Sequence, residues 1–191
     1  WNIASSLSNS TVTGGKSWVA YSSFLKGINI KSDSIYRQLF YNQSKYKTQS
    51  VFDVLETIGY ENYLIAGLGG FENYKIEWDE ILQFLGTKNV IKFKDLEYKG
   101  IRFNLGPSAP DQYLLNKSIQ LIKEKNQEKP FSFFVETINS HYPFDSPTHI
   151  FENWKECNSA TSNDFKIIKN QSSNQIENYF TAIEYQLKCI E

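Results

Sequence analysis

The most apolar stretch of the chain, FSFFVETIN at residues 131–139, directly follows Pro130. An apolar run without polar alternation is typical of a strand that is covered on both faces, as the strands of a parallel sheet are. We therefore predict that this run forms a central parallel strand. Its end leads Asn139, Ser140 and His141 into a loop that Pro143 closes.

Helical patterns alternate with short apolar runs along the rest of the chain. Helices are predicted at residues 17–25 (followed by Gly27), 51–58 (ended by Gly59), 77–85 (closed by Gly86), 111–126 and 176–190, and shorter strands at 63–67 and 89–93. This alternation predicts an α/β fold with a mostly parallel sheet flanked by helices. Active sites in such sheets lie beyond the carboxyl ends of the strands.

Length and charge limit the classes of protein to which the chain can belong. Its 191 residues suit one domain, and a polar segment rich in Asn and Ser at 155–174 is expected to be an exposed loop. The formal net charge of −1 argues against non-specific binding of nucleic acid. We expect no transmembrane segment in this chain, since no run approaches about 18 consecutive apolar residues.

A pair of glycines precedes the first predicted helix, in the sequence Thr13-Gly14-Gly15-Lys16-Ser17. The residues Gly15-Lys16-Ser17 match the end of the phosphate-loop pattern GxxxxGK[ST]. The first glycine of that pattern would be residue 10, which is Ser10, so we reject a nucleotide-binding loop. Glycines let the backbone approach a phosphate or sulfate closely. A serine at a helix start lies near outward N–H groups and the positive end of the helix dipole, which stabilise anions and an alkoxide nucleophile. Serine is also a common N-cap, so a purely structural role stays open.

His141 lies in the sequence TINSHYPF at 137–144, which begins at the end of the apolar run at 131–139. A histidine at the end of a strand is well placed to bind an anion or to protonate a leaving group. A packed or solvent-facing loop histidine is the alternative. His149 has no partner pattern, and we expect it to be structural.

Several segments together resemble the alkaline-phosphatase superfamily, in particular its sulfatase and lipoteichoic-acid-synthase-like branch. TVTGGKSWVAYSSFLKG at 11–27 resembles the nucleophile segment, and KPFSFFVETINSHYPFDSP at 129–147 resembles the strand and loop that carry the family's histidine. SVFDVLETIGYENYLIAG at 50–67 is similar to the family's helix, Gly-Tyr turn and strand. YFTAIEYQLKCIE at 179–191 resembles the helix before the second metal-ligand segment. The four segments occur in the family's order.

The resemblance implies a covalent mechanism with a hydroxyl nucleophile. Ser17 matches the nucleophile, which is also a metal ligand in the family, with Thr11 and Thr13 open as alternatives. No cysteine lies in this segment, which disfavours a sulfatase that uses formylglycine. The substrate-binding residues that the resemblance implies are Gly15, Lys16, Trp18 and His141.

The resemblance further implies a divalent metal ion (Mn, Mg, Ca or Zn) whose remaining ligands lie outside this chain. Residues 1–191 would then be a single partial catalytic domain, truncated at both ends. The implied partner is a phosphate or sulfate ester, with a lipid or glycan head group as one form. The implied location is outside the cytoplasm, in the periplasm or cell envelope, with any membrane anchor in regions that this chain does not cover. The alternative is a non-catalytic α/β domain that binds a glycan or a protein.

Overall fold

The computed structural model describes residues 16–70, 77–103, 108–126, 128–168 and 175–191. The chain divides into two compact units. The first comprises Trp1–Tyr63, Glu77–Asn89 and Lys129–Phe133, and the second comprises Leu64–Ile76, Val90–Glu128 and Phe134–Glu191. Each is described by itself below.

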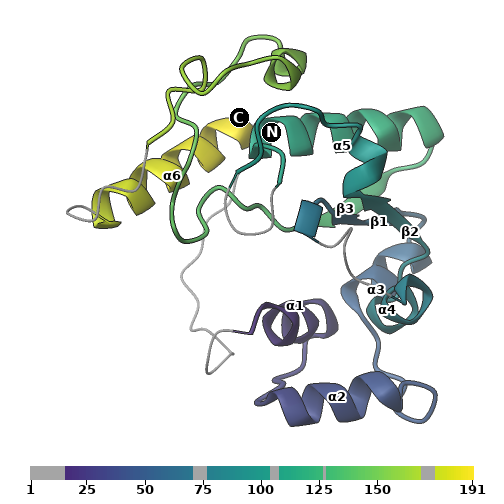
Figure 1. Ribbon diagram of the computed structural model, residues 1–191. Helices are drawn as coiled ribbons and strands as arrows, with labels where there is room; N and C mark the ends of the chain where they lie inside the picture. Colours follow the sequence, from purple (N-terminus) through teal and green to yellow (C-terminus); the bar gives the residue numbers. More distant parts are fainter. Residues whose placement is uncertain (1–15, 71–76, 104–107, 127, 169–174) are drawn as a thin grey trace. The chain divides into compact units, whose positions relative to one another are not determined.

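The sheet of the described residues contains the strands β1 (Glu61–Ala66), β2 (Asn89–Lys92) and β3 (Phe131–Val135), in the order β2-β1-β3 (Figure 1). The Glu61 N–H donates to the Pro130 carbonyl at 2.9 Å. The Asn89 side chain donates to the Asn62 carbonyl at 3.0 Å. The starts of the strands therefore lie side by side, and the strands run parallel. This confirms the predicted α/β fold with a parallel sheet.

The prediction that the run at 131–139 is the central strand is wrong for this sheet. β1 is hydrogen-bonded on both sides and buries Tyr63, Leu64 and Ile65. β3 lies at an edge, and all five of its residues are only half-buried. The strand also ends at Val135, four residues before the apolar run does. Apolarity alone does not tell which strand has neighbours on both sides.

The first unit contains the helices α1 (Ser17–Lys26), α2 (Asp33–Tyr41), α3 (Val51–Thr57) and α4 (Trp78–Leu85). α1 packs against the other three. All but α2 were predicted. The buried side chain of Asn62 connects this unit internally: its Nδ2 donates to the Phe52 carbonyl at 2.8 Å, and its Oδ1 accepts from Ser132 Oγ at 2.6 Å.

Apolar residues recur at helical spacing along α3, but they do not form its buried face. Val51, Val54 and Ile58 are exposed, whereas Phe52 is buried. A helix of seven residues has few positions, and the packing of one aromatic ring decides which side turns inward.

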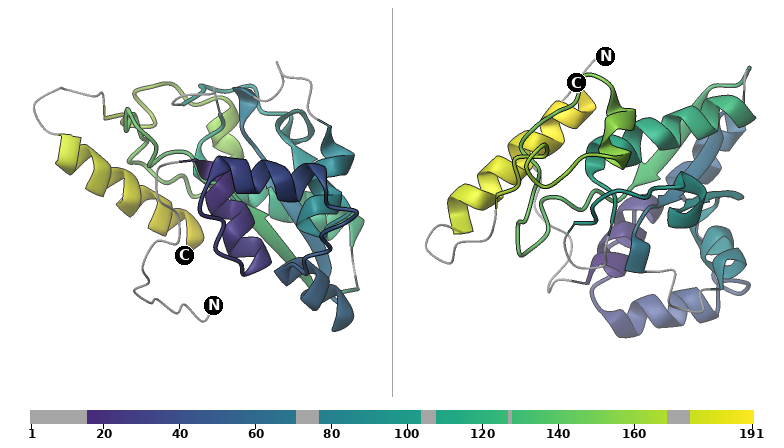
Figure 2. Two further views of the ribbon diagram at one scale, coloured as in Figure 1. Left: turned by 90° about the horizontal axis from the view of Figure 1, so that it is seen from below. Right: turned by 45° about the horizontal axis from the view of Figure 1, so that its top comes forward.

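The second unit contains the short 3-10 helices η2 (Phe93–Leu96) and η3 (Trp154–Asn158), together with α5 (Asp111–Lys125) and α6 (Gln175–Ile190). α5 packs on both α6 and η3 (Figure 2). α6 forms where the sequence predicts a helix, but Ile176, Phe180 and Leu187 of its apolar face are exposed. No helix among the described residues is long and apolar enough to span a membrane.

The expected exposed loop at 155–174 is only partly exposed over residues 155–168, and residues 169–174 lie outside the described residues. Cys157 and Phe165 within it are fully buried. The Phe165 ring packs edge-on against Phe103 and Phe151, at centroid distances of 5.1 and 5.2 Å. The two buried residues were not predicted because the other residues of the segment are mostly polar. Two apolar side chains change the average hydropathy of such a segment very little.

Candidate functional site

The candidate nucleophile Ser17 is the first residue of α1 and is exposed. The preceding Lys16 is the N-cap, and its carbonyl accepts the N–H groups of Val19 and Ala20 at 3.1 and 3.2 Å. The predicted helix start at Ser17 and the glycine stop at Gly27 are thus confirmed. The alternative in which Ser17 is the N-cap is wrong, since Lys16 takes that position. Ser17 Oγ lies at the positive end of the helix dipole.

One carboxylate holds both side chains that flank Ser17. Asp33, the first residue of α2, accepts Trp18 Nε1–H at 2.8 Å and Arg37 Nε–H at 2.9 Å. Lys16 Nζ lies 3.3 Å from Asp33, and 5.4 Å from the centre of the Trp18 ring. Hydrogen bonds from three side chains lower the pKa of Asp33 to about 2. The bond from Arg37 has the largest effect, followed by those from Trp18 and Lys16.

The lowered pKa of Asp33 leads to a test by pH titration. A carboxyl group whose folded pKa lies below its ordinary value of 3.8 contributes stability that is fully present above that value. This contribution declines as the pH falls from about 3.8 and is lost once the pH has fallen through about 2. We therefore expect the assigned indole N–H signal of Trp18 in NMR spectra to stay constant from about pH 7 to about pH 4 and to shift near pH 2.

The variant Asp33→Asn serves as the control for that titration, because it keeps the shape of the side chain and removes the titrating group. In this variant the shift near pH 2 should disappear. A midpoint at the ordinary carboxyl pKa in the unsubstituted protein would contradict the network around Asp33.

His141 lies in the loop that follows β3, and its side chain is exposed. The His141 N–H donates to the Ile138 carbonyl at 2.9 Å, and the Phe144 N–H donates to the His141 carbonyl at 2.8 Å. The ring atom Nδ1 lies 2.6 Å from the Tyr142 carbonyl oxygen. A carbonyl only accepts, so this contact places the ring proton on Nδ1, and Nε2 is then the atom available to a ligand.

The predicted site residues lie in two groups. Lys16, Ser17 and Trp18 are together at the start of α1 in the first unit, and His141 belongs to the second unit. A pocket shared by Ser17 and His141 therefore stays a prediction. Gly15, Thr11 and Thr13 lie outside the described residues. His149 packs its ring edge-on against Phe151 at 4.8 Å.

Asp33 and the helix that it begins were not predicted from the sequence. Ser32 was the available signal, since a serine followed by an acidic residue is typical of a helix N-terminus, and the Ser32 side chain accepts the Ile35 N–H at 3.3 Å. Asp111 stands at the first position of the helix predicted at 111–126, where an aspartate is a common N-cap. The structure instead places Asp111 inside the first turn of α5 and fully buries it.

The described residues do not supply a metal site. No three side chains of His, Cys, Asp or Glu in this part of the chain lie close enough together to hold a metal ion. Metal ligation by Ser17 therefore stays a prediction from the resemblance.

Comparisons with known proteins agree with this fold. The family model described as Sulfatase matches residues 4–190. The crystal structure of the lipoteichoic acid synthase LtaP from Listeria monocytogenes superposes with a TM-score of 0.61 at 19% identity. The match covers 94% of this chain and 39% of that one, so the chain spans well under half the length of LtaP.

A further solved structure is of a protein in the alkaline phosphatase superfamily from Vibrio parahaemolyticus. It has a TM-score of 0.41 and 21% identity, over 74% of this chain and 29% of that one. No curated protein sequence matches this chain.

Proposed function

Since the chain belongs to the sulfatase family, we propose that it is part of an enzyme that hydrolyses or transfers a phosphate or sulfate ester through the Ser17 hydroxyl. The observation that carries this proposal is the start of α1. Ser17 is exposed on the first turn there, and Asp33 holds Lys16 and Trp18 beside it.

In the proposed reaction, Ser17 Oγ forms a bond to the phosphorus or sulfur atom and loses its proton to solvent. The bond from that atom to the alcohol oxygen breaks, and the alcohol leaves after gaining a proton. Water or a second alcohol then attacks the phospho- or sulfo-serine and restores the hydroxyl. The positive end of α1 and the Lys16 ammonium would stabilise the negative charge of the group being transferred.

His141 is proposed to bind a non-bridging oxygen of the same group through Nε2–H in its protonated form. The divalent ion that the family resemblance implies would neutralise further charge. Its other ligands are proposed to lie in parts of the protein that this chain does not cover. A lipid or glycan head group as the alcohol, and a location outside the cytoplasm, belong to the same proposal.

Three chromogenic esters test the reaction class with the whole protein: p-nitrophenyl phosphate, bis-p-nitrophenyl phosphate and p-nitrophenyl sulfate. We expect one of them to be turned over at least about tenfold faster than the others. Chelation with EDTA is expected to abolish turnover, and addition of Mn²⁺, Mg²⁺, Ca²⁺ or Zn²⁺ to restore it. Absence of turnover for every ester with every metal would contradict the proposed function.

A further inference from the structure

A buried carboxylate lies behind the loop of His141. Asp111, the first residue of α5, is 0% exposed. Its Oδ1 accepts the N–H of Ile138 at 2.9 Å, and its Oδ2 accepts the N–H of Asn139 at 3.1 Å. In return, Asn139 Oδ1 accepts the Asp111 N–H at 2.7 Å, and Asn139 is itself 0% exposed. Asp111 and Asn139 thus form a reciprocal clamp between α5 and the loop.

The clamp leads directly to the backbone of His141. Ile138 donates its N–H to Asp111, while its carbonyl accepts the N–H of His141. Only one residue therefore stands between the buried carboxylate and the turn that presents the histidine. The His141 side chain, by contrast, is exposed, and its ring Nδ1 contacts the carbonyl of the adjacent Tyr142.

α6 reinforces the clamp and holds the far side of the loop. Gln186 Nε2 donates to Asp111 Oδ2 at 2.9 Å. Seven residues earlier on α6, the ring of Tyr179 packs against Phe144 at a centroid distance of 5.4 Å. The loop is therefore held before His141 by hydrogen bonds and after it by an aromatic contact.

The Asp111 carboxylate carries the negative charge where α5, α6 and the loop of His141 meet. Burial raises the pKa of Asp111 to about 6, against the lowering effect of the bonds from Ile138, Gln186 and Asn139. The titratable groups that face it from α6 are Tyr185 and Cys189, and burial raises the pKa of both. At pH 7 to 8 these two are neutral, and Asp111 carries the charge that strengthens its hydrogen bonds.

We propose that Asp111 is a positioning residue for the reaction: its clamp on Ile138 and Asn139 holds the His141 ring in the orientation that binds the ester's anionic group. This inference rests on the proposed function. A carboxylate is suited to the task because it accepts several N–H bonds at once, and such bonds to a charged group are stronger than neutral ones.

The test compares Asp111→Asn with a matched control, Asp164→Asn, in the whole protein. Asp164 is an exposed carboxylate of the same unit that also accepts a backbone N–H, from Thr161 at 2.8 Å, but it does not touch the loop. Asp111→Asn keeps the side-chain shape and turns an N–H₂ group toward donors. We expect hydrogen exchange of the Ile138, Asn139 and His141 amides to accelerate about 10- to 100-fold, and Asp164→Asn to stay within about twofold.

The kinetic readout separates positioning from simple loss of folded protein. Loss of folded protein lowers kcat and leaves KM unchanged, whereas a loop that visits the competent orientation less often raises KM. We expect Asp111→Asn to raise KM about 10-fold or more. In a His141→Ala background the same change should add less than about twofold, because the ring to be positioned is gone.

A gentler variant, Gln186→Leu, keeps the test decisive if Asp111→Asn does not fold. It removes one of the bonds to Asp111 and should accelerate exchange of the same amides about 3- to 10-fold. Unchanged exchange in the folded variants overturns the clamp. Faster exchange with an unchanged KM overturns its role in positioning His141. An unsubstituted protein that turns over no ester contradicts the proposed function instead, and the exchange measurement still decides on the clamp.

Discussion

Replacing Ser17 with alanine in the whole protein is expected to lower turnover of the preferred ester by about 10³-fold or more. The change removes the only atom that forms the covalent bond in the proposed reaction. It leaves the helix intact, because alanine is the best helix former and Lys16, not Ser17, is the N-cap. Initial rates measure the loss. Mass spectrometry of the protein quenched during turnover should locate the phospho- or sulfo-group on Ser17 and find none in the variant.

Three further variants decide which hydroxyl reacts. Ser17→Thr keeps a hydroxyl at the same position and should retain part of the activity, whereas Thr11→Ala and Thr13→Ala should each leave it within about threefold. A loss confined to one of the threonine variants would transfer the nucleophile to that residue. No activity in the unsubstituted protein would favour the non-catalytic alternative.

Replacing Gly86 with alanine is expected to lower the free energy of unfolding by about 3 kcal/mol. Gly86 ends α4 in the left-handed region, at φ 79°, which costs a residue with a side chain about 1–2 kcal/mol. A Cβ there would also collide with Ser50 Oγ and lie 2.7 Å from Asp53 Oδ1.

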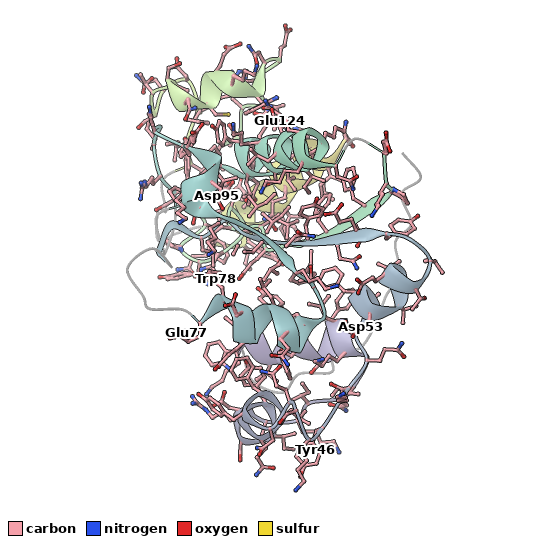
Figure 3. The ribbon with its side chains drawn as sticks, turned by 90° about the vertical axis from the view of Figure 1, so that its right-hand side faces the viewer. Tyr46, Asp53, Glu77, Trp78, Asp95 and Glu124 are labelled. Atoms are coloured by element: carbon pink, nitrogen blue, oxygen red, sulfur yellow. The ribbon has the colours of Figure 1, made fainter. Side chains whose placement is uncertain are left out.

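The side chains of these two residues cap α3, which precedes α4 in the chain. Ser50 Oγ accepts the Asp53 N–H at 3.1 Å, and Asp53, labelled in Figure 3, accepts the Ser50 N–H at 2.6 Å. Displacing them disrupts the capping box of α3, and the loss of such a cap costs about 1 kcal/mol. The alanine therefore weakens two helices at once.

Gly27→Ala is the matched control for Gly86→Ala. Gly27 also ends its helix in the left-handed region, at φ 60°, but a Cβ there meets nothing within 4 Å. It should lose only the conformational part, about 1–2 kcal/mol. Urea denaturation measures both variants. Equal losses would mean that the contact with the capping box of α3 carries no energy.

Local structure was largely predictable, since it depends on neighbouring residues. The helix of Ser17 starts and stops where the sequence predicts because a glycine can take the left-handed conformation at Gly27. The same holds for Gly86 after α4. Which side of a helix is buried was not predictable: Val51 and Val54 of α3 repeat at helical spacing yet are exposed, because periodicity shows an apolar face but not what covers it.

The sequence by itself determined the family, through the order of its segments, and the places of Ser17 at a helix start and His141 after a strand. Only the tertiary structure decided what holds them. Trp18 donates a hydrogen bond to Asp33, which is 15 residues away in the sequence. Asp111 accepts hydrogen bonds from Ile138 and Gln186, which are 27 and 75 residues away. Such bonds form when packing brings a donor and an acceptor atom from distant segments within about 3 Å, and no local pattern of residues encodes that distance.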